Sequence, residues 1–168
     1  MANTYTLISS QTAANSTTAT YSFTSIPATY TDLVLKYSCR NSASLQNITM
    51  QFNSITSGYT YRMIYGDGAT ASSFDQGTFS GTYLFAGNII NSTSTFMNGE
   101  IYIPNYANTS YNKSVSVDVV EENNATTAYA QLIAGLIPTT SAINRIDIST
   151  GNNFAQYSTF YLYGIKNS

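Results

Sequence analysis

An alternation of apolar and polar side chains with a period of two dominates the chain. Successive side chains of a strand point to opposite faces, so this period predicts strands with one buried face. The β-branched and aromatic residues in these runs favour the same structure. The clearest runs predict strands at 32–40, 48–52, 59–65, 114–119 and 160–165. Weaker runs predict strands at 5–9, 20–24, 74–79, 96–103 and 143–149.

Two segments leave the local structure open. Asn98-Gly99 fits a tight type I′ turn, but it also fits a glycine bulge within one strand, because the polar alternation continues through Glu100. Residues 128–136 carry apolar side chains at both helical and strand spacing. Their neighbours are all predicted strands, so we expect a strand here rather than a short helix.

About ten short strands separated by turn residues, with no strong helical pattern, are typical of an all-β fold. We expect a two-sheet antiparallel β-sandwich that is jelly-roll-like. No change of composition marks a second domain, so residues 1–168 are predicted to form a single sandwich domain. Residues 9–20 are rich in Ser, Thr, Ala and Asn, which predicts a surface loop or a mobile arm.

The composition is almost free of charge and excludes several classes of protein. Charged residues make up 8% of the chain, whereas Ser, Thr and Asn provide 63 of its 168 residues. Six scattered cations cannot form the basic patch of a nucleic-acid-binding protein. The single cysteine, Cys39, excludes a disulfide scaffold. Because the chain has no His and one Cys, we expect neither a metal site nor another cofactor.

The sequence shows no signal for secretion or for a membrane. Its first residues lack the cationic and apolar regions of a signal peptide. No window approaches the ~18 apolar residues of a membrane span. We therefore expect a protein that is made in a cytosol and stays there until lysis. A surface rich in Tyr, Ser, Thr and Asn would suit a component of a particle released in this way.

The residues offer little for catalysis, and we expect that the protein is not an enzyme. Without His, neither Ser-His-Asp nor Cys-His chemistry is available within one chain. A glycoside hydrolase needs only two carboxylates about 5–9.5 Å apart. We interpret the acidic candidates as solvated charges at strand ends. These candidates are Glu100, Asp118, Glu121 and Glu122.

Tyrosine is the best candidate for a binding function. Its ring offers a large contact area at a low entropic cost, and its hydroxyl can form a hydrogen bond. The alternative is that these rings belong to the core, because tyrosine at a period of two is often buried. The candidates are Tyr102, Tyr106 and Tyr111 around the turn at 104–105, and Tyr59, Tyr61 and Tyr65 beside Arg62.

Four segments of the chain carry a resemblance to a known group. They are IPATYTDLVL at 26–35, IYIPNYA at 101–107, ENNATTAY at 122–129 and QYSTFYLYGI at 156–165. These segments resemble small virion structural proteins of tailed bacteriophages. The resemblance implies a β-sandwich that decorates the capsid or forms part of a tail or head fibre. It carries over no functional residues, because the shared positions are strand and turn residues.

The leading hypothesis is a virion protein that binds the assembled capsid as a decoration or cement protein. Its partners would be the major capsid protein or other virion proteins. A surface with little charge suits this role, because burying unpaired charge is costly. A homotrimer would fit a symmetry axis of the capsid, although the sequence carries no signal for an oligomer. The alternative is a tail or head fibre that binds a host-surface glycan through Tyr102, Tyr106 and Tyr111. The carboxylate-pair hydrolase is the weakest interpretation.

Overall fold

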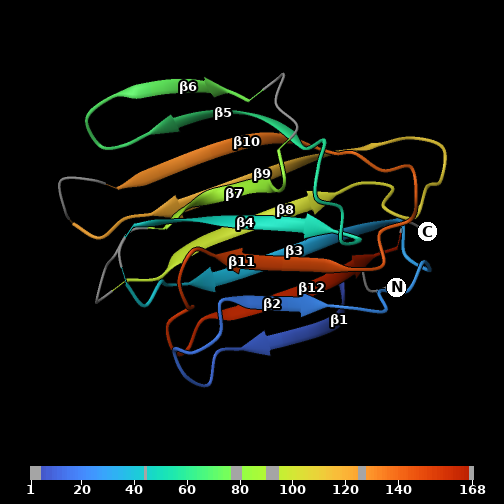
Figure 1. Ribbon diagram of the computed structural model, residues 1–168, viewed down its shortest axis with the longest axis horizontal. Coiled ribbons are helices and arrows are strands. Elements are labelled where there is room, and N and C mark those ends of the chain that lie inside the picture. The colour runs from blue at the N-terminus through green and yellow to red at the C-terminus, as the bar shows by residue number, and fades with distance from the viewer. Residues whose placement is uncertain (1–4, 44, 77–80, 90–94, 125–127, 167–168) are drawn as a thin grey trace.

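The computed structural model describes residues 5–43, 45–76, 81–89, 95–124 and 128–166. Among these residues there is no helix, and the twelve strands form two antiparallel sheets (Figure 1). The strands are β1 (Tyr5–Thr12), β2 (Thr20–Phe23), β3 (Asp32–Cys39), β4 (Gln46–Phe52), β5 (Thr60–Gly66), β6 (Ala71–Asp75), β7 (Leu84–Ile89), β8 (Met97–Ile103), β9 (Lys113–Glu121), β10 (Tyr129–Ile137), β11 (Ile146–Thr150) and β12 (Thr159–Ile165). The predicted all-β fold with two sheets is confirmed, and the jelly-roll topology stays a prediction.

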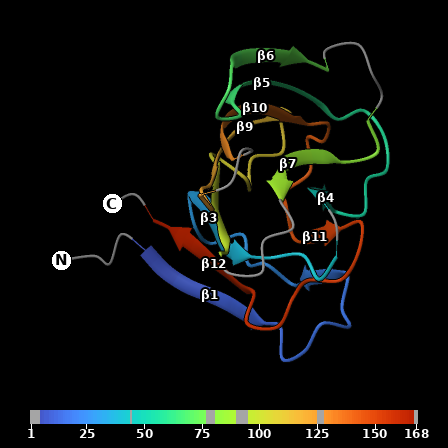
Figure 2. The same cartoon turned by 90° about the vertical axis from the view of Figure 1, so that its left-hand side faces the viewer.

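The two sheets differ in size. The larger sheet has eight strands in the order β1-β12-β3-β8-β9-β10-β5-β6, and the smaller has four in the order β2-β11-β4-β7. Figure 2 shows the layers from the side, with β7, β4 and β11 in one layer and β3 and β12 in the other. No helix in the described part of the chain is long and apolar enough to cross a membrane.

The inner faces of the two sheets meet in one hydrophobic core. Strand β9 shows how the alternation produces it, because Val115, Val117 and Val119 are buried while Ser114 and Ser116 are exposed. Fully burying such an apolar side chain is worth roughly 1.5–3 kcal/mol. The same alternation gives each sheet a second face, which points away from the core. We call this second face the outer face of the sheet.

The structure replaces both interpretations of Asn98-Gly99, which are wrong. The two residues lie within β8, which pairs with β3 without a shift of register. Gly99 lies opposite Tyr37, and a Cβ atom on Gly99 would come within 2.2 Å of the Tyr37 ring. The Tyr37 side chain crosses the core, and its hydroxyl donates a hydrogen bond of 2.7 Å to the carbonyl of Ala86 in β7. Glycine is therefore needed here for close packing rather than for a turn.

The other local expectations have mixed outcomes. Residues 129–137 form β10, so the preference for a strand over a helix is confirmed, and residues 125–127 lie outside the described residues. The strand expected at 74–79 is instead β6, at Ala71–Asp75, and residues 77–79 also lie outside the described residues. Strand β7 was not predicted. Its first four residues are all buried, so it shows no alternation of polar and apolar positions.

The segment 9–20 is divided between a strand and a connection. Residues 9–12 belong to β1, and residues 13–19 connect β1 with β2. Backbone hydrogen bonds tie this connection to the loop before β12. The Ala13 amide donates to the Ser158 carbonyl at 2.8 Å, and the Phe154 amide donates to the Thr18 carbonyl at 2.9 Å. Ala13, the first residue of the connection, is fully buried.

Candidate functional site

Two of the tyrosines expected at a binding surface lie in the core. Tyr59 and Tyr106 are each 0% exposed. The Tyr59 hydroxyl accepts the Phe52 amide at 2.8 Å, and the Tyr106 hydroxyl donates to the Pro27 carbonyl. Burial raises the pKa of both phenols above the usual value. Their rings are therefore not available for contact with a partner.

The remaining tyrosines around the turn at 104–105 do not share one surface with Tyr106. Tyr102 is partly buried, and its hydroxyl donates to Asp32 Oδ2 at 2.8 Å, which is the main reason that its pKa is raised. The other Asp32 oxygen accepts the Asn105 amide at 2.8 Å. Tyr111, in contrast, is 74% exposed. The three tyrosines thus occupy three different environments.

The second predicted group is divided between the two faces of β5. Tyr61 points inward and lies between the rings of Phe74 and Phe85, with centroid distances of 5.9 and 5.3 Å. Tyr65 is also partly buried. Arg62 points the other way and is exposed. Its Nε lies 3.3 Å from Asp75 Oδ1 on β6.

The outer face of the eight-stranded sheet is the main candidate for a binding surface. Side chains on this face line up in rows across the strands. The row through its centre, called the central row, begins with Tyr161 on β12 and ends on β6. It consists of Tyr161, Lys36, Glu100, Asp118, Leu132, Ile64 and Ser73. The next row contains Tyr163, Val34, Tyr102, Ser116, Ala134, Arg62 and Asp75.

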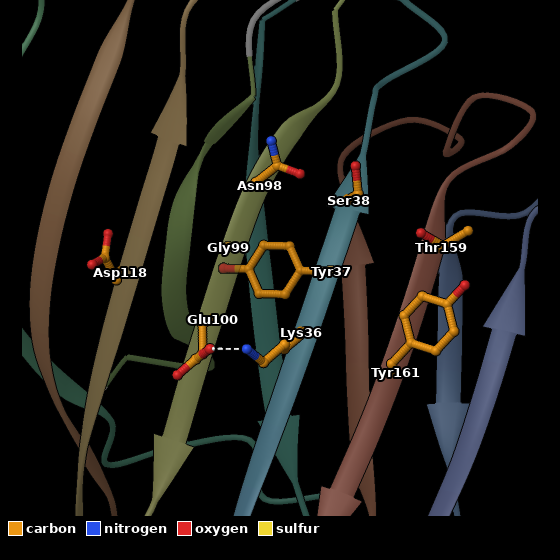
Figure 3. Close-up of a pocket in the computed structure, with 9 residues that line it drawn as sticks. All are labelled: Lys36, Tyr37, Ser38, Asn98, Gly99, Glu100, Asp118, Thr159 and Tyr161. Atoms are coloured by element: carbon orange, nitrogen blue, oxygen red, sulfur yellow. Dashed lines mark ion pairs between the residues drawn. The ribbon is translucent and has the colours of Figure 1, made fainter. Parts of the chain in front are cut away.

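A shallow hollow of about 440 Å³ lies over the charged part of the central row (Figure 3). Lys36 Nζ and Glu100 Oε2 form an ion pair of 2.7 Å, and the hydrogen bond to Glu100 raises the pKa of Lys36. Asp118 lies directly opposite Glu100 in the register of β8 and β9. Glu100 therefore lies between the Lys36 ammonium group and a second carboxylate, Asp118. Tyr161 closes the far side of the hollow.

An apolar strip follows on β9, β10 and β5. Its largest side chains are Ile64, Leu132 and Val120, which are 61%, 51% and 49% exposed. The exposed side chains of Ala130 and Ala134 extend it along β10. A shallow groove of about 630 Å³ runs over part of this strip. Large contiguous apolar patches on soluble proteins often mark contact surfaces, so this strip is a candidate for one.

The opposite edge of the same face carries a cluster of aromatic side chains on β1 and β12. The rings of Tyr5 and Tyr163 meet edge to face at 6.0 Å, and those of Tyr161 and Tyr163 stack at 6.5 Å. Leu7 lies opposite Tyr163 and is 51% exposed. We call Tyr5, Leu7, Tyr161 and Tyr163 the tyrosine end. The alternation at 160–165 could have revealed part of it, because Tyr161 and Tyr163 lie opposite the apolar face of that strand.

The fold brings two of the four acidic candidates for glycoside hydrolysis together, in the middle of their strands rather than at strand ends, and separates the other two from them. Glu100 and Asp118 share the outer face, whereas Glu121 is 2% exposed at the end of β9 and Glu122 is exposed beyond that strand.

Among the described residues, no three His, Cys, Asp or Glu side chains gather as a metal site would require. Cys39 is buried, and burial holds the pKa of its thiol well above the usual value.

Comparison with known proteins finds no family model that matches this sequence and no curated protein that is significantly similar to it.

Proposed function

We propose that this protein is a structural component of a tailed-phage virion that binds the assembled capsid shell as a decoration or cement protein. The observation that carries the proposal is the tyrosine end. It gathers three tyrosines and one leucine on an edge of the outer face, and none of these four side chains is charged. The resemblance of the sequence to virion structural proteins supports a place in the particle, and the shell is the partner that we propose.

The chemistry of the tyrosine end suits a protein–protein contact. Tyr5, Leu7 and Tyr161 are 48%, 51% and 36% exposed, so each can bury further apolar area against a partner. Tyrosine is enriched among the residues that dominate binding energy, and charged residues are depleted at the centres of interfaces. Because the rings already contact one another, little side-chain freedom remains to be lost on binding.

The opposite outer face supports this assignment by contrast. On the four-stranded sheet, polar side chains bind one another. Arg145 donates to both carboxylate oxygens of Asp147 at 2.7 and 2.8 Å, and the hydroxyls of Thr20 and Ser149 are 2.9 Å apart. The polar groups of such a face already have hydrogen-bond partners, so the face gains little free energy from contact with another protein. A cement protein bound through its other face would stabilise the shell by mass action.

The test uses phage particles that lack this protein and purified variants added back to them. Wild-type protein should co-sediment with the particles in many copies and raise their resistance to heat. Tyr161→Lys places a charge within the tyrosine end and should weaken binding by about 2 kcal/mol, which is roughly thirtyfold. Tyr111→Lys is the matched control, because Tyr111 is 74% exposed but lies outside the tyrosine end.

Two results would contradict the proposal. One is the absence of the protein from mature particles, and the other is equal binding by Tyr161→Lys and wild type. A few copies per particle, together with weaker adsorption to the host for Tyr111→Lys, would favour the fibre that binds a glycan.

A further inference from the structure

We infer that the outer face of the eight-stranded sheet is an interface with a second copy of this chain, related by a two-fold axis that runs along the strands between β9 and β10. This inference goes beyond the proposed function. It uses the part of the face between β3 and β6, whereas the tyrosine end lies on β1 and β12.

The order of charges across the face carries the inference. From β3 to β6 the exposed charged side chains on the outer face of the described strands are Lys36 on β3, Glu100 on β8, Asp118 on β9, Arg62 on β5 and Asp75 on β6. Strand β10 lies between Asp118 and Arg62 and contributes apolar side chains. The order of signs is therefore plus, minus, minus, apolar, plus, minus.

A two-fold axis between β9 and β10 reverses this order in the second copy. Strand β3 then faces β6, β8 faces β5, and β9 faces β10. Lys36 meets Asp75 of the second copy, and Glu100 meets Arg62 of the second copy. Each contact occurs twice, because a two-fold interface repeats every contact. The surface is therefore complementary to itself in charge.

The apolar strip lies at the centre of this arrangement, beside Asp118 of β9. Val120 on β9 and Leu132 on β10 flank the axis, and Ile64 follows on β5. These three side chains are 49%, 51% and 61% exposed, and the second copy would cover them. Ala130 and Ala134 leave room for a close approach. Apolar area at the centre is typical of a stable interface, and Asp118 is the charged group there that needs a partner from the second copy.

The charged groups do not lie in one row, but their side chains span the difference. Arg62 and Asp75 belong to the row of Tyr102, two residues along the strands from the central row. Two residues of a strand cover about 7 Å, a distance that long Arg and Lys side chains bridge. Packed sheets also rotate by about 30° relative to each other, which inclines the two-fold axis by about half that angle to the strands and brings neighbouring rows closer at one side.

The arrangement also gives a partner to Asp118, the third carboxylate beside Glu100 and Asp75. Asp118 is directly opposite Glu100, and like charges in that position are unfavourable within the single chain. Arg62 of the second copy can bind both carboxylates, because a guanidinium group offers several donors in one plane. In the single chain both ion pairs are exposed, with side chains 42–67% accessible, so each contributes little. In the dimer they become one network that surrounds the apolar strip.

The dimer leaves each tyrosine end free. Strands β1 and β12 lie beyond β3, outside the overlap of the two copies. A dimer would therefore carry two tyrosine ends, one at each side. Two linked docking surfaces bind more tightly than one when both can reach their partner.

The first test is the mass of the purified full chain by sedimentation equilibrium. At roughly 100 µM, where a dimer with a micromolar Kd is mostly formed, wild type should have close to twice the chain mass of 18.2 kDa. Leu132→Lys puts two like charges near the axis and should give a monomer. Leu45→Lys is the matched control, because Leu45 is 50% exposed on the other layer, and it should remain a dimer.

The second test exchanges charges between two variants. Arg62→Glu alone and Glu100→Arg alone each place like charges opposite each other at both contacts, and each should raise the Kd at least about tenfold. An equimolar mixture of the two should form a mixed dimer with near wild-type affinity, since both contacts become complementary again. Circular dichroism would verify that each variant is folded.

Four results would overturn the inference: a wild-type monomer at this concentration, a trimer, a dimer that survives Leu132→Lys, or a mixture that does not associate. The Tyr161→Lys variant should still dimerise, so failure of the dimer and failure of the capsid-binding proposal can be told apart.

Discussion

The outer faces of the two sheets leave their side chains in different states. On the four-stranded sheet, Asp147 accepts hydrogen bonds from Arg145 and from the Ser22 hydroxyl. On the eight-stranded sheet, Ile64 and Leu132 lie open to solvent. A face whose polar groups bind one another needs no partner in water. Covering an exposed apolar face with a partner, in contrast, is favourable in free energy.

The difference arises from which strands are neighbours. Asp147 lies between Ser22 on β2 and Gln51 on β4 in the register of β11, so it has polar groups on both sides. Leu132 lies between Asp118 on β9 and Ile64 on β5. Alternation alone places all of these residues on an outer face, and the pairing of strands then decides what each one contacts.

The largest expected effect concerns Gly99, which lets β8 of the eight-stranded sheet pack closely against Tyr37. Gly99→Ala should lower the free energy of unfolding by about 3 kcal/mol, because the new Cβ would lie 2.2 Å from the Tyr37 ring and the core cannot make room. Urea unfolding followed by circular dichroism measures it. Gly66→Ala is the control, since the nearest atom to its Cβ would be 3.9 Å away. Equal stability of the two variants would mean that the Tyr37 ring is not held against β8.

The second prediction concerns the satisfied face. The Asp147 side chain is 10% exposed and accepts charge-assisted hydrogen bonds, so Asp147→Asn should lower the free energy of unfolding by about 2 kcal/mol. Chemical unfolding at neutral pH measures the loss. An Asp147→Asn variant as stable as wild type would show that this network adds nothing to the fold, and the contrast between the faces would then lose its energetic basis.

The third prediction concerns Tyr102 and alkaline pH. Its hydrogen bond to Asp32 raises the pKa of Tyr102 above 10.0, so the folded chain holds this proton more tightly than the unfolded chain. The stabilisation is complete below pH 10 and is lost as the pH rises through the raised pKa. Tyr102→Phe should therefore cost about 1 kcal/mol at pH 8 and less at higher pH.

Unfolding in urea at pH 8 and pH 11 would show this change, with Tyr111→Phe as a control that alters neither value. A loss for Tyr102→Phe that does not depend on pH would exclude the hydrogen bond to Asp32 as its cause.

The smallest effect on stability is expected for the exposed ion pair in the hollow. The Lys36 and Glu100 side chains are 50% and 42% exposed, so Glu100→Gln should change the free energy of unfolding of the monomer by no more than about 0.5 kcal/mol. Unfolding at low concentration in low and high salt would measure it. A loss as large as that of Asp147→Asn would contradict the distinction drawn between the two faces.

Most of the strands could be predicted, and the binding residues mostly could not. The strands at 32–40 and 160–165 were recognised because alternation is a local property of the backbone. Tyr59 and Tyr106 were selected because tyrosine suits binding, but its ring suits a core equally well when the hydroxyl finds a buried carbonyl or amide. No pattern within one segment distinguishes these two fates.

The sequence by itself determined the all-β class, the period of two that assigns each side chain to a face, and the scarcity of charge. These are properties of short segments and of composition. Only the tertiary structure decided that Glu100 lies opposite Asp118, that Leu132 lies beside Ile64, and that Tyr5 meets Tyr163. The physical reason is that neighbours across a sheet are chosen by the packing of the whole core, through pairs of strands that are distant along the chain.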